Sequence, residues 1–266
     1  MERKKILAQR YKQVVKANEL IQKTNFQLNL NQQKIILYLI SQISPYDDDF
    51  KLYNFSISDF CHLMNIQIES GKTYENLRNS IKQICDKSQW IRLENGNDTL
   101  VRWIQKARIN PRNGNIEIQL DEDLKPYLLQ LKEKFTAYQL LWVLNFRSKF
   151  SIRLYEFVKS IHYNELEPYE NTYSLNDLKS RMGADNYKTY QHFRERALEP
   201  AISEINKSSD KHIVFTPIKT GKAVTHIKLR ISTKPFEERD KIRSELDKAV
   251  GAEQLSLFDL ENAGVI

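Results

Sequence analysis

The sequence predicts an α+β fold made of two tandem winged-helix domains related by pseudo-symmetry. The order helix, helix, β-hairpin occurs twice along the chain, and this order is typical of a helix-turn-helix followed by a β wing. The segment Phe55–Met64 (FSISDFCHLM) also aligns without gaps on Tyr173–Met182 (YSLNDLKSRM). The period of about 116–118 residues indicates one duplicated domain, because solenoid repeats have periods of about 20–50 residues.

Composition favours a globular chain with a polyanionic partner. Of the 266 residues 41% are hydrophobic, and the formal net charge is +7, which fits DNA although basic soluble enzymes also exist. The only two cysteines, Cys61 and Cys85, have no disulfide or CxxC spacing, so we expect reduced thiols in a cytoplasmic protein. No apolar run approaches the roughly 18 residues of a membrane span, and we expect no membrane partner.

The expected domains are residues 1–134, a winged helix with a basic N-terminal arm, and residues 135–235, a second winged helix. Residues 236–266 are expected to form a charged linker and a flexible tail, separate from the body. Residues 1–18 contain six Lys or Arg and one Glu. They predict either a solvated, frayed helix or an arm on DNA, and the helix is the preferred interpretation because termini are often loosely ordered.

In the first domain, helices are expected where apolar residues recur every three or four positions and strands where they alternate. The expected helices are Leu30–Ile43, a short helix capped by Ser58-Asp59 and ending near Met64, and Thr73–Lys87. The expected strands are Phe50–Ile57, Trp90–Leu93, Leu100–Ile109 and Asn115–Leu120. Asn95-Gly96 and Asn113-Gly114 are turn signals between strands.

Between the domains, Asp121–Lys134 is expected to be helical, and the apolar segment Tyr138–Tyr163 is expected to form one long helix or a pair at the centre of the molecule. The second domain then repeats the order of the first. Its expected elements are the strand Tyr173–Leu175, the helix Asn176–Met182 capped by Asn176 or Asp177, the helix Asn186–Asn206, and the strands Ile213–Ile218 and Ala223–Ile231. A helix or linker, Phe236–Val250, follows.

The helix Asn186–Asn206 is the main candidate for contact with DNA. Its apolar positions leave polar and basic residues on the other side, namely Lys188, Gln191, His192 and Arg196, with Arg194 at the border. Arg reads guanine bidentately and Gln reads adenine in the major groove, although an ordinary basic surface helix has a similar composition. Pro200 should bend the helix, because it removes one backbone hydrogen bond.

Two further groups of residues are candidates for contact with DNA. Lys219 and Lys222 flank the tip of the last hairpin, where ammonium groups suit the phosphate backbone. The corresponding helix of the first domain has fewer arginines, so we expect it to position the protein more than to read bases. Its candidate residues are Lys72, Thr73, Arg78, Asn79 and Lys82.

The sequence contains little that would support enzymatic activity. The five histidines form no HxH or HExxH pair that would hold a metal. Gly71-Lys72-Thr73 imitates the end of a phosphate-binding loop, but the required earlier glycine is replaced by Ile66. We therefore expect no enzymatic activity, no catalytic residue, no metal and no cofactor.

The tail contains the segment QLSLF, Gln254–Phe258, which resembles the peptide by which bacterial replication proteins dock on the DNA polymerase sliding clamp. Apolar anchors from a flexible tail would fill a cleft while the glutamine bonds at its rim. The predicted clamp-binding residues are Gln254, Leu255, Leu257 and Phe258. The alternative is a tail that folds back on its own domain.

The segments LNLNQQKIILYLISQI, FRSKFSIRLYEFVKS and FRERALEPAISEIN, with the strands that follow, resemble the replication initiator proteins of iteron-containing bacterial plasmids. The resemblance runs from about Val14 to Ile231. It implies two winged-helix domains that bind repeated sites (iterons) in double-stranded DNA at a plasmid origin. It also implies an active monomer that helps to melt the duplex and recruits host replication proteins, and a homodimer through the N-terminal domain that often represses its own gene.

By this resemblance, the helix with Gln191, Arg194 and Arg196 is the main base reader, and the first domain contacts the neighbouring groove. A winged-helix transcription regulator without a role in replication is the main alternative. A nicking initiator enzyme is a second one, but it needs a metal-binding histidine pair and a nucleophilic tyrosine, and this chain has only unpaired tyrosines.

Overall fold

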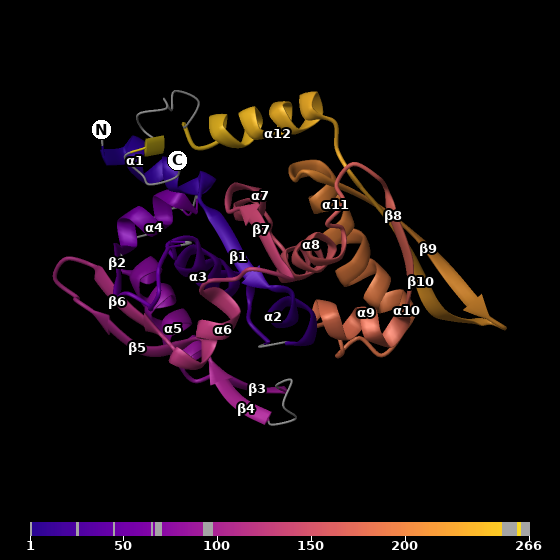
Figure 1. Cartoon of the computed structure of the whole chain (residues 1–266), viewed down its shortest axis with the longest axis horizontal. Coiled ribbons are helices and arrows are strands. Elements are labelled where there is room, and N and C mark those ends of the chain that lie inside the picture. Colours follow the sequence, from indigo (N-terminus) through magenta and orange to yellow (C-terminus); the bar gives the residue numbers. More distant parts are fainter. Residues whose placement is uncertain are drawn as a thin grey trace.

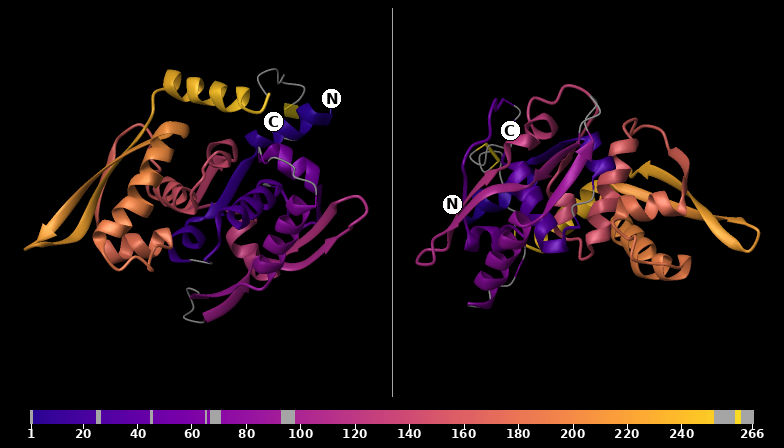
Figure 2. Two further views of the ribbon diagram at one scale, coloured as in Figure 1. Left: turned by 180° about the vertical axis from the view of Figure 1, so that it is seen from behind. Right: turned by 90° about the horizontal axis from the view of Figure 1, so that it is seen from below.

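The computed structural model describes residues 2–24, 27–44, 46–64, 66, 71–92, 98–251 and 260–261. Two α/β units, one from each half of the chain, lie on either side of a central helix, α8 (Lys149–Ile161) (Figure 1). Helix α12 (Phe236–Lys248) runs back from the second unit towards α1 (Glu2–Ala8), on the edge of the molecule where the N-terminus lies (Figures 1 and 2).

The first unit contains a helix-turn-helix and a three-stranded antiparallel sheet in the order β2-β6-β5. Its elements are β2 (Tyr53–Ser56), α4 (Ile57–Leu63), α5 (Lys72–Cys85), β5 (Ile104–Ile109) and β6 (Asn115–Leu120). A separate hairpin of β3 (Ser88–Arg92) and β4 (Asp98–Arg102) is inserted after α5. The strand expected over residues 100–109 is therefore two strands, which end and begin on either side of the buried Trp103.

The second unit repeats this plan, with the strand order β8-β10-β9. Its elements are β8 (Tyr169–Ser174), α9 (Leu175–Met182), α10 (Tyr190–Phe193), η3 (Arg194–Leu198), α11 (Glu199–Ser208), β9 (Lys211–Thr220) and β10 (Ala223–Thr233). In both sheets the last strand lies between the other two. The structure thus confirms the predicted α+β class and the two winged helices.

The internal repeat has the same cap in each copy. Ser56 accepts a hydrogen bond from the Asp59 amide at 3.0 Å, and Ser174 accepts one from the Asp177 amide at 3.1 Å. The caps expected at residues 58–59 and 176–177 were wrong, because in each copy the strand ends at the serine and the helix begins immediately after it. A serine side chain at this position satisfies one of the free amides of the first turn.

The N-terminal segment is more ordered than expected. After η1 (Gln9–Tyr11), the strand β1 (Gln13–Ala17) pairs antiparallel with β7 (Phe135–Gln139). The interpretation of residues 1–18 as one frayed helix was therefore wrong beyond Tyr11. The helical segment expected at residues 121–134 is also shorter, and consists of η2 (Glu122–Leu124) and α6 (Lys125–Leu128).

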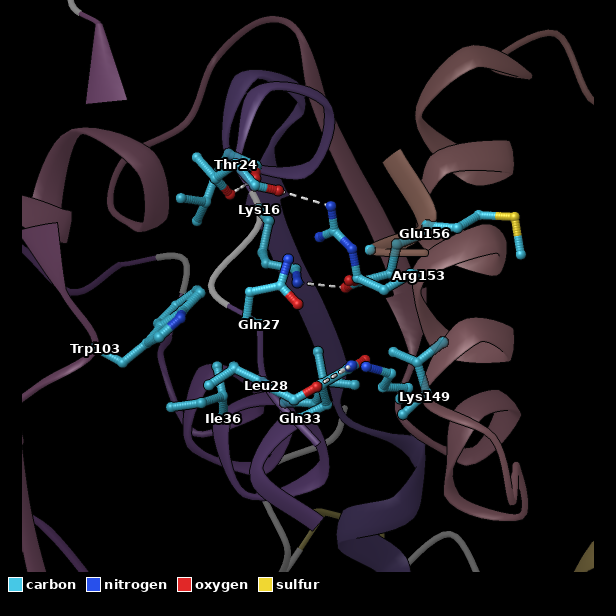
Figure 3. A pocket seen from close by; sticks show the side chains of 15 residues that line it. Lys16, Thr24, Gln27, Leu28, Gln33, Ile36, Trp103, Lys149, Arg153 and Glu156 are labelled. Atoms are coloured by element: carbon cyan, nitrogen blue, oxygen red, sulfur yellow. Dashed lines mark hydrogen bonds and ion pairs between the residues drawn. The ribbon is translucent and has the colours of Figure 1, made fainter. Parts of the chain in front are cut away.

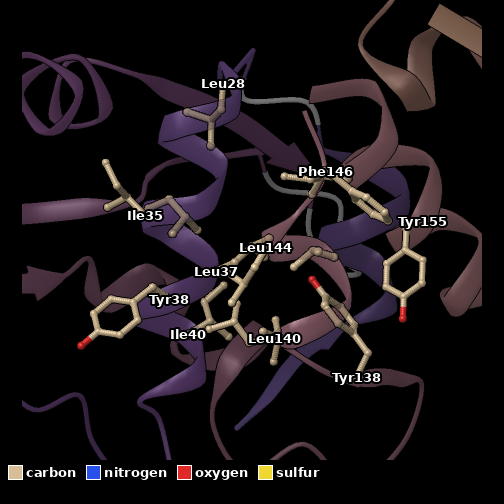
Figure 4. Close-up of a cluster of buried hydrophobic side chains, with 14 of the residues drawn as sticks. Leu28, Ile35, Leu37, Tyr38, Ile40, Tyr138, Leu140, Leu144, Phe146 and Tyr155 are labelled. Carbon is tan, nitrogen blue, oxygen red and sulfur yellow. The ribbon is translucent and has the colours of Figure 1, made fainter. Parts of the chain in front are cut away.

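The hydrophobic core joins the two units. Helices α2 (Asn18–Lys23) and α3 (Leu30–Ser41) of the first half pack against α8, and α7 (Leu141–Leu144) precedes α8. Figure 4 shows Leu37 of α3 beside Leu144, and Phe146 beside Tyr155 of α8, all within one buried cluster. The apolar segment expected as one helix or two is a pair, and Tyr138 belongs to the preceding strand instead.

Buried charges fix α8 against the first half of the chain (Figure 3). Lys16 of β1 forms an ion pair with Glu156 of α8, and both side chains are buried. Arg153, one turn earlier on α8, donates hydrogen bonds to the backbone oxygens of Thr24 at 2.7 Å and Ile21 at 3.3 Å. Because breaking a buried pair leaves an uncompensated charge, these contacts hold α8 against the first half of the chain.

Helix α12 was expected to be part of a separate linker, and this expectation was wrong. Its Ile242 and Leu246 side chains are buried, and Asp247 accepts a hydrogen bond from the Tyr11 hydroxyl. The Arg243 guanidinium lies 5.8 Å from the ring centre of Trp142. The helix therefore connects the end of the second unit to the beginning of the chain. None of the helices in the described ranges is long and apolar enough to span a membrane.

Candidate nucleic-acid interface

The turn between the two helices of the second helix-turn-helix begins at a glycine. Gly183 ends α9 with a left-handed φ of 67°, a conformation that glycine adopts without the penalty of a Cβ atom. The next helix begins at Tyr190, four residues later than expected, and Thr189 caps it by accepting a hydrogen bond from the His192 amide at 3.2 Å. We call Tyr190–Ser208 (α10, η3 and α11) the recognition helix.

The C-terminal half of the recognition helix is fixed to the body. The Glu204 carboxylate accepts hydrogen bonds from the Arg147 amide at 2.9 Å and the Ser148 amide at 3.2 Å, at the beginning of α8. The Asn206 side chain bonds to both backbone groups of Ile213 in β9, at 2.7 and 2.8 Å. Because α11 is held on two sides, the N-terminal half of the recognition helix keeps a fixed orientation.

The N-terminal half of the recognition helix presents a polar, basic face. Gln191, His192 and Arg196 are exposed, and so is Lys188 just before the helix. Phe193 and Ala197 are fully buried beneath them. The structure thus exposes three of the residues predicted for this face on the helix itself, whereas Lys188 lies before the Thr189 cap, outside the helix.

Arg194 lies at the border of this face, as expected, and is paired with acidic residues. Its guanidinium is 3.4 Å from the Glu199 carboxylate and 3.6 Å from the Glu195 carboxylate. It also lies 5.9 Å from the ring centre of Tyr190. Burial raises the pKa of the Tyr190 hydroxyl above its ordinary value, although the neighbouring Arg194 acts in the opposite direction.

The helix departs from regular α-helical geometry just before Pro200. Arg194–Leu198 forms a π turn, in which the Glu199 amide donates to the Arg194 carbonyl. Pro200 has no amide hydrogen and is one of the first residues of α11, so a regular α-helix would leave one carbonyl without its donor. The wider turn accommodates this defect without ending the helix.

The second-domain wing is the hairpin β9–β10, and it is longer than expected. Its strands continue to Thr220 and Ala223, so that the turn consists of Gly221 and Lys222 alone. Gly221 has a left-handed φ of 62°. Lys222 and Lys219 are both exposed at this end of the hairpin, which places two positive charges at the tip.

The first domain offers a weaker basic surface. Lys72, Arg78, Asn79 and Lys82 are exposed on α5, and Thr73 is partly buried. Lys82 forms an exposed ion pair with Asp86, one turn later, at 2.7 Å, which reduces its net attraction for phosphate.

Reasoning from the sequence missed several residues of these surfaces. Arg112 is exposed in the turn of the hairpin β5–β6, the first-domain wing. The turn itself was expected from Asn113-Gly114, so comparison with the second-domain wing would have found this arginine. The helix cap Thr189 and the two carboxylates beside Arg194 were also missed, because they become recognisable only from the helix start and the π turn.

The two wings project at opposite ends of the molecule (Figures 1 and 2). Helices α5 and α10 both lie in the lower half of the view in Figure 1, one in each unit. Within the described ranges, no group of three or more His, Cys, Asp or Glu side chains is placed to hold a metal ion. The turn Asn95-Gly96 and the segment Gln254–Phe258 lie outside the described residues.

Comparisons with known proteins agree with this geometry. Residues 13–159, more than half of the chain, match the family model of the first winged-helix domain of the initiator replication protein, and residues 174–231 match the model of the second. A replication initiation protein of Escherichia coli is 26% identical over 209 residues, which are 76% of this chain and 64% of that protein. The chain thus spans just under two thirds of the length of this relative.

A solved structure has a similar fold. The crystal structure of the Pi initiator protein in complex with iteron DNA superposes with a TM-score of 0.69, at 20% sequence identity. The match covers 85% of this chain and 98% of that one. Because both family models match in the expected order and on the two units described above, the chain belongs to the initiator Rep protein family.

Proposed function

We propose that the protein is a plasmid replication initiator that binds repeated origin sites in double-stranded DNA. The observation that carries the proposal is the exposed basic face of the recognition helix, with Gln191 and Arg196, beside a wing that ends in two lysines. Family membership and the likeness to an initiator solved on iteron DNA support it. Promotion of origin opening and recruitment of host replication proteins are parts of the same proposal.

In this proposal, the N-terminal half of the recognition helix enters the major groove. Arg196 and Gln191 are long side chains suited to base edges, and a good bidentate contact contributes about 1–3 kcal/mol of discrimination. His192 lies on the exposed side of the helix and Lys188 just before it, and Lys219 and Lys222 bind the phosphate backbone beside the groove. The fixed C-terminal half of the helix sets the angle of entry.

The first domain positions the protein on the neighbouring groove. Arg78, Asn79, Lys72 and Thr73 contact the backbone with less sequence discrimination, because α5 has a single arginine among its exposed residues. Lys82 contributes least, since it is paired with an acidic neighbour. Exposed ion pairs contribute little to stability, so DNA can displace this one.

We propose that the monomer is the form active in replication. A homodimer, formed through the first domain, represses the protein's own gene. The inserted hairpin supports it, because Trp90 and Leu100 lie opposite each other on β3 and β4 and are 63% and 45% exposed. Aromatic residues are enriched at protein interfaces. Trp90→Ser should shift sedimentation towards the monomer, and an unchanged dimer would reject this surface.

The tail is proposed to bind the polymerase sliding clamp through Gln254, Leu255, Leu257 and Phe258. The support is the sequence match alone. Phe258→Ala should abolish binding to purified clamp and leave origin binding intact. Unchanged clamp binding in this variant would reject the tail as the docking segment.

We further propose that the protein acts in the cytoplasm without catalysis, cofactor or metal. Two rival functions remain testable: a transcription regulator would bind its promoter without supporting replication, and a nicking enzyme would cleave supercoiled origin DNA with Mg²⁺ or Mn²⁺.

The decisive experiment disrupts this gene on a plasmid that carries the origin and supplies the gene in trans. We expect the plasmid to be maintained only when the gene is supplied. Maintenance without the protein would reject the initiator function, and strand cleavage of the purified origin would favour the enzyme.

A further inference from the structure

The π turn of the recognition helix changes which side chains face each other. In an α-helix, residues three and four positions apart are neighbours on the surface, and residues five positions apart are not. The hydrogen bond from the Glu199 amide to the Arg194 carbonyl spans five residues, so these two residues come to lie one above the other. Their side chains form an ion pair with a distance of 3.4 Å between Arg194 Nε and Glu199 Oε1.

Arg194 is held on further sides as well. Its Nη2 atom lies 3.6 Å from Glu195 Oε1, and its guanidinium carbon lies 5.9 Å from the ring centre of Tyr190. The Arg194 side chain is 39% exposed, so it is accessible to DNA. Two carboxylates therefore lie within 4 Å of its guanidinium, and both are partly exposed.

Arg196 offers a direct contrast. It is exposed, and in the described part of the chain it has no carboxylate partner. Within the described ranges, one of the two arginines in this half of the helix thus has carboxylates within 4 Å and the other has none. A paired arginine adds little to the attraction for phosphates, which supplies nearly all of the binding to random DNA.

Building on the proposed function, we propose that Glu199 is a positioning residue that sets the discrimination of the recognition helix. Through the π turn it holds Arg194 away from the phosphates of random duplex DNA. Binding to random DNA is thereby weakened more than binding to an origin repeat, where Arg196 supplies the base contact. Pro200 contributes to the same arrangement, because it has no amide hydrogen and therefore favours the π turn.

The salt dependence of binding tests this inference. The full-length protein is titrated against a random-sequence duplex and an origin repeat over a series of NaCl concentrations, by fluorescence anisotropy. Each phosphate neutralised by the protein contributes about 0.9 to the slope of log K against log salt. The compared proteins are wild type, Glu199→Gln, Arg194→Ala, the double variant and Pro200→Ala, with Glu237→Gln on the exposed side of α12 as a control for net charge.

We expect Glu199→Gln to steepen the slope on random DNA by about 0.9 and to lower the preference for the origin repeat. Arg194→Ala should leave the wild-type slope unchanged, and the double variant should return to it. Pro200→Ala should act in the same direction as Glu199→Gln, because a regular α-helix would separate the ion pair. The Glu237→Gln control should bind like the wild type.

Two results would overturn the inference. A shallower slope for Arg194→Ala alone would mean that Arg194 already binds a phosphate in the wild type. If Glu199→Gln does not change the wild-type slope, or if the double variant keeps the steeper slope of Glu199→Gln, then Arg194 is not the group that Glu199 restrains. A wild type that does not prefer the origin repeat would instead overturn the proposed function, and the inference with it.

Discussion

The two winged-helix domains share one plan but differ in the second helix of the helix-turn-helix. In both domains the helix-turn-helix follows a strand that ends at a capping serine, Ser56 or Ser174, and both sheets have the same strand order. In the first domain, α5 is an uninterrupted helix of 14 residues. In the second, the recognition helix contains a π turn.

This difference shows how one fold can hold two kinds of surface. On α5 the basic residue Lys82 has an acidic partner at the regular spacing of four residues. On the recognition helix the π turn pairs Arg194 with Glu199, and Arg196 has no acidic partner among the residues that the structure describes. The second copy has a proline, Pro200, in this helix, and α5 has none. The arginines of the two helices therefore have different neighbours, although the two domains share one topology. We propose that the second copy reads the sequence and the first positions the protein.

The largest expected difference concerns stability. Phe193 in the recognition helix and Leu77 in α5 are both buried, with exposed fractions of 0% and 7%. Phe193→Ala should lower the free energy of unfolding by about 3–5 kcal/mol, and Leu77→Ala by about 2–3 kcal/mol, because the larger buried ring leaves the larger cavity. Urea denaturation followed by circular dichroism measures both. A greater loss for Leu77→Ala would mean that the first copy is the more tightly packed one.

The next effect concerns binding. Arg196→Ala should weaken binding to an origin repeat by about 1–3 kcal/mol and binding to random DNA by much less. Arg78→Ala on α5 should weaken both by a similar amount, because a phosphate contact carries no sequence information. Competition titrations with the two duplexes give the ratio. Equal losses for Arg196→Ala on both duplexes would remove the distinction between the copies.

A smaller effect concerns pH. In the second domain, burial opposes ionisation of Glu165, but hydrogen bonds and charges from Lys159 and Lys211 outweigh it and lower the pKa to about 2. Because the folded pKa is depressed, the carboxylate stabilises the protein above its ordinary pKa, near 4.5, and this contribution is lost as the pH falls towards 2.

Glu165→Gln should therefore lower the free energy of unfolding at pH 7 by about 1 kcal/mol, a value reduced for solvent screening of a partly exposed group. The deficit should shrink between pH 4.5 and pH 3 in urea denaturation. The matched variant Glu117→Gln removes an exposed pair with Arg108 at 3.6 Å in the first domain, and should change stability by less than about 0.5 kcal/mol. A constant deficit across this pH range would argue against the ion pairs of Glu165.

The smallest effects concern the wings. Lys222→Ala and Arg112→Ala each remove one exposed positive charge from a hairpin turn. If each contacts one phosphate, each should reduce the slope of log K against log salt by about 0.9, equally on specific and random DNA. A loss confined to Lys222→Ala would mean that the first-domain wing does not reach the DNA.

The sequence predicted well what depends on local pattern. The repeat of Phe55–Met64 in Tyr173–Met182 marks two helix-turn-helix units, and the structure has both. The polar face of the recognition helix also follows from helical spacing, as the exposure of Gln191, His192 and Arg196 confirms.

The features that the sequence did not predict depend on long-range contacts or on a change of helix type. Strand β1 pairs with β7 across more than a hundred residues, and strand formation depends strongly on such context. Helix α12 packs against the body through Ile242, Leu246 and Asp247. Two apolar residues in a highly charged segment are too few to predict this packing from the sequence. The pairing of Arg194 with Glu199 requires the π turn, because helical spacing of 3.6 residues separates them.

The most direct test of the division between the two copies is a base-by-base binding profile. One origin repeat is varied at each base pair in turn, and the affinities of wild type, Arg196→Ala and Arg78→Ala are measured. We predict that Arg196→Ala loses discrimination at one or two adjacent base pairs and keeps it elsewhere, while Arg78→Ala weakens binding to every variant by the same factor. A profile flattened by Arg78→Ala and lowered uniformly by Arg196→Ala would contradict the account.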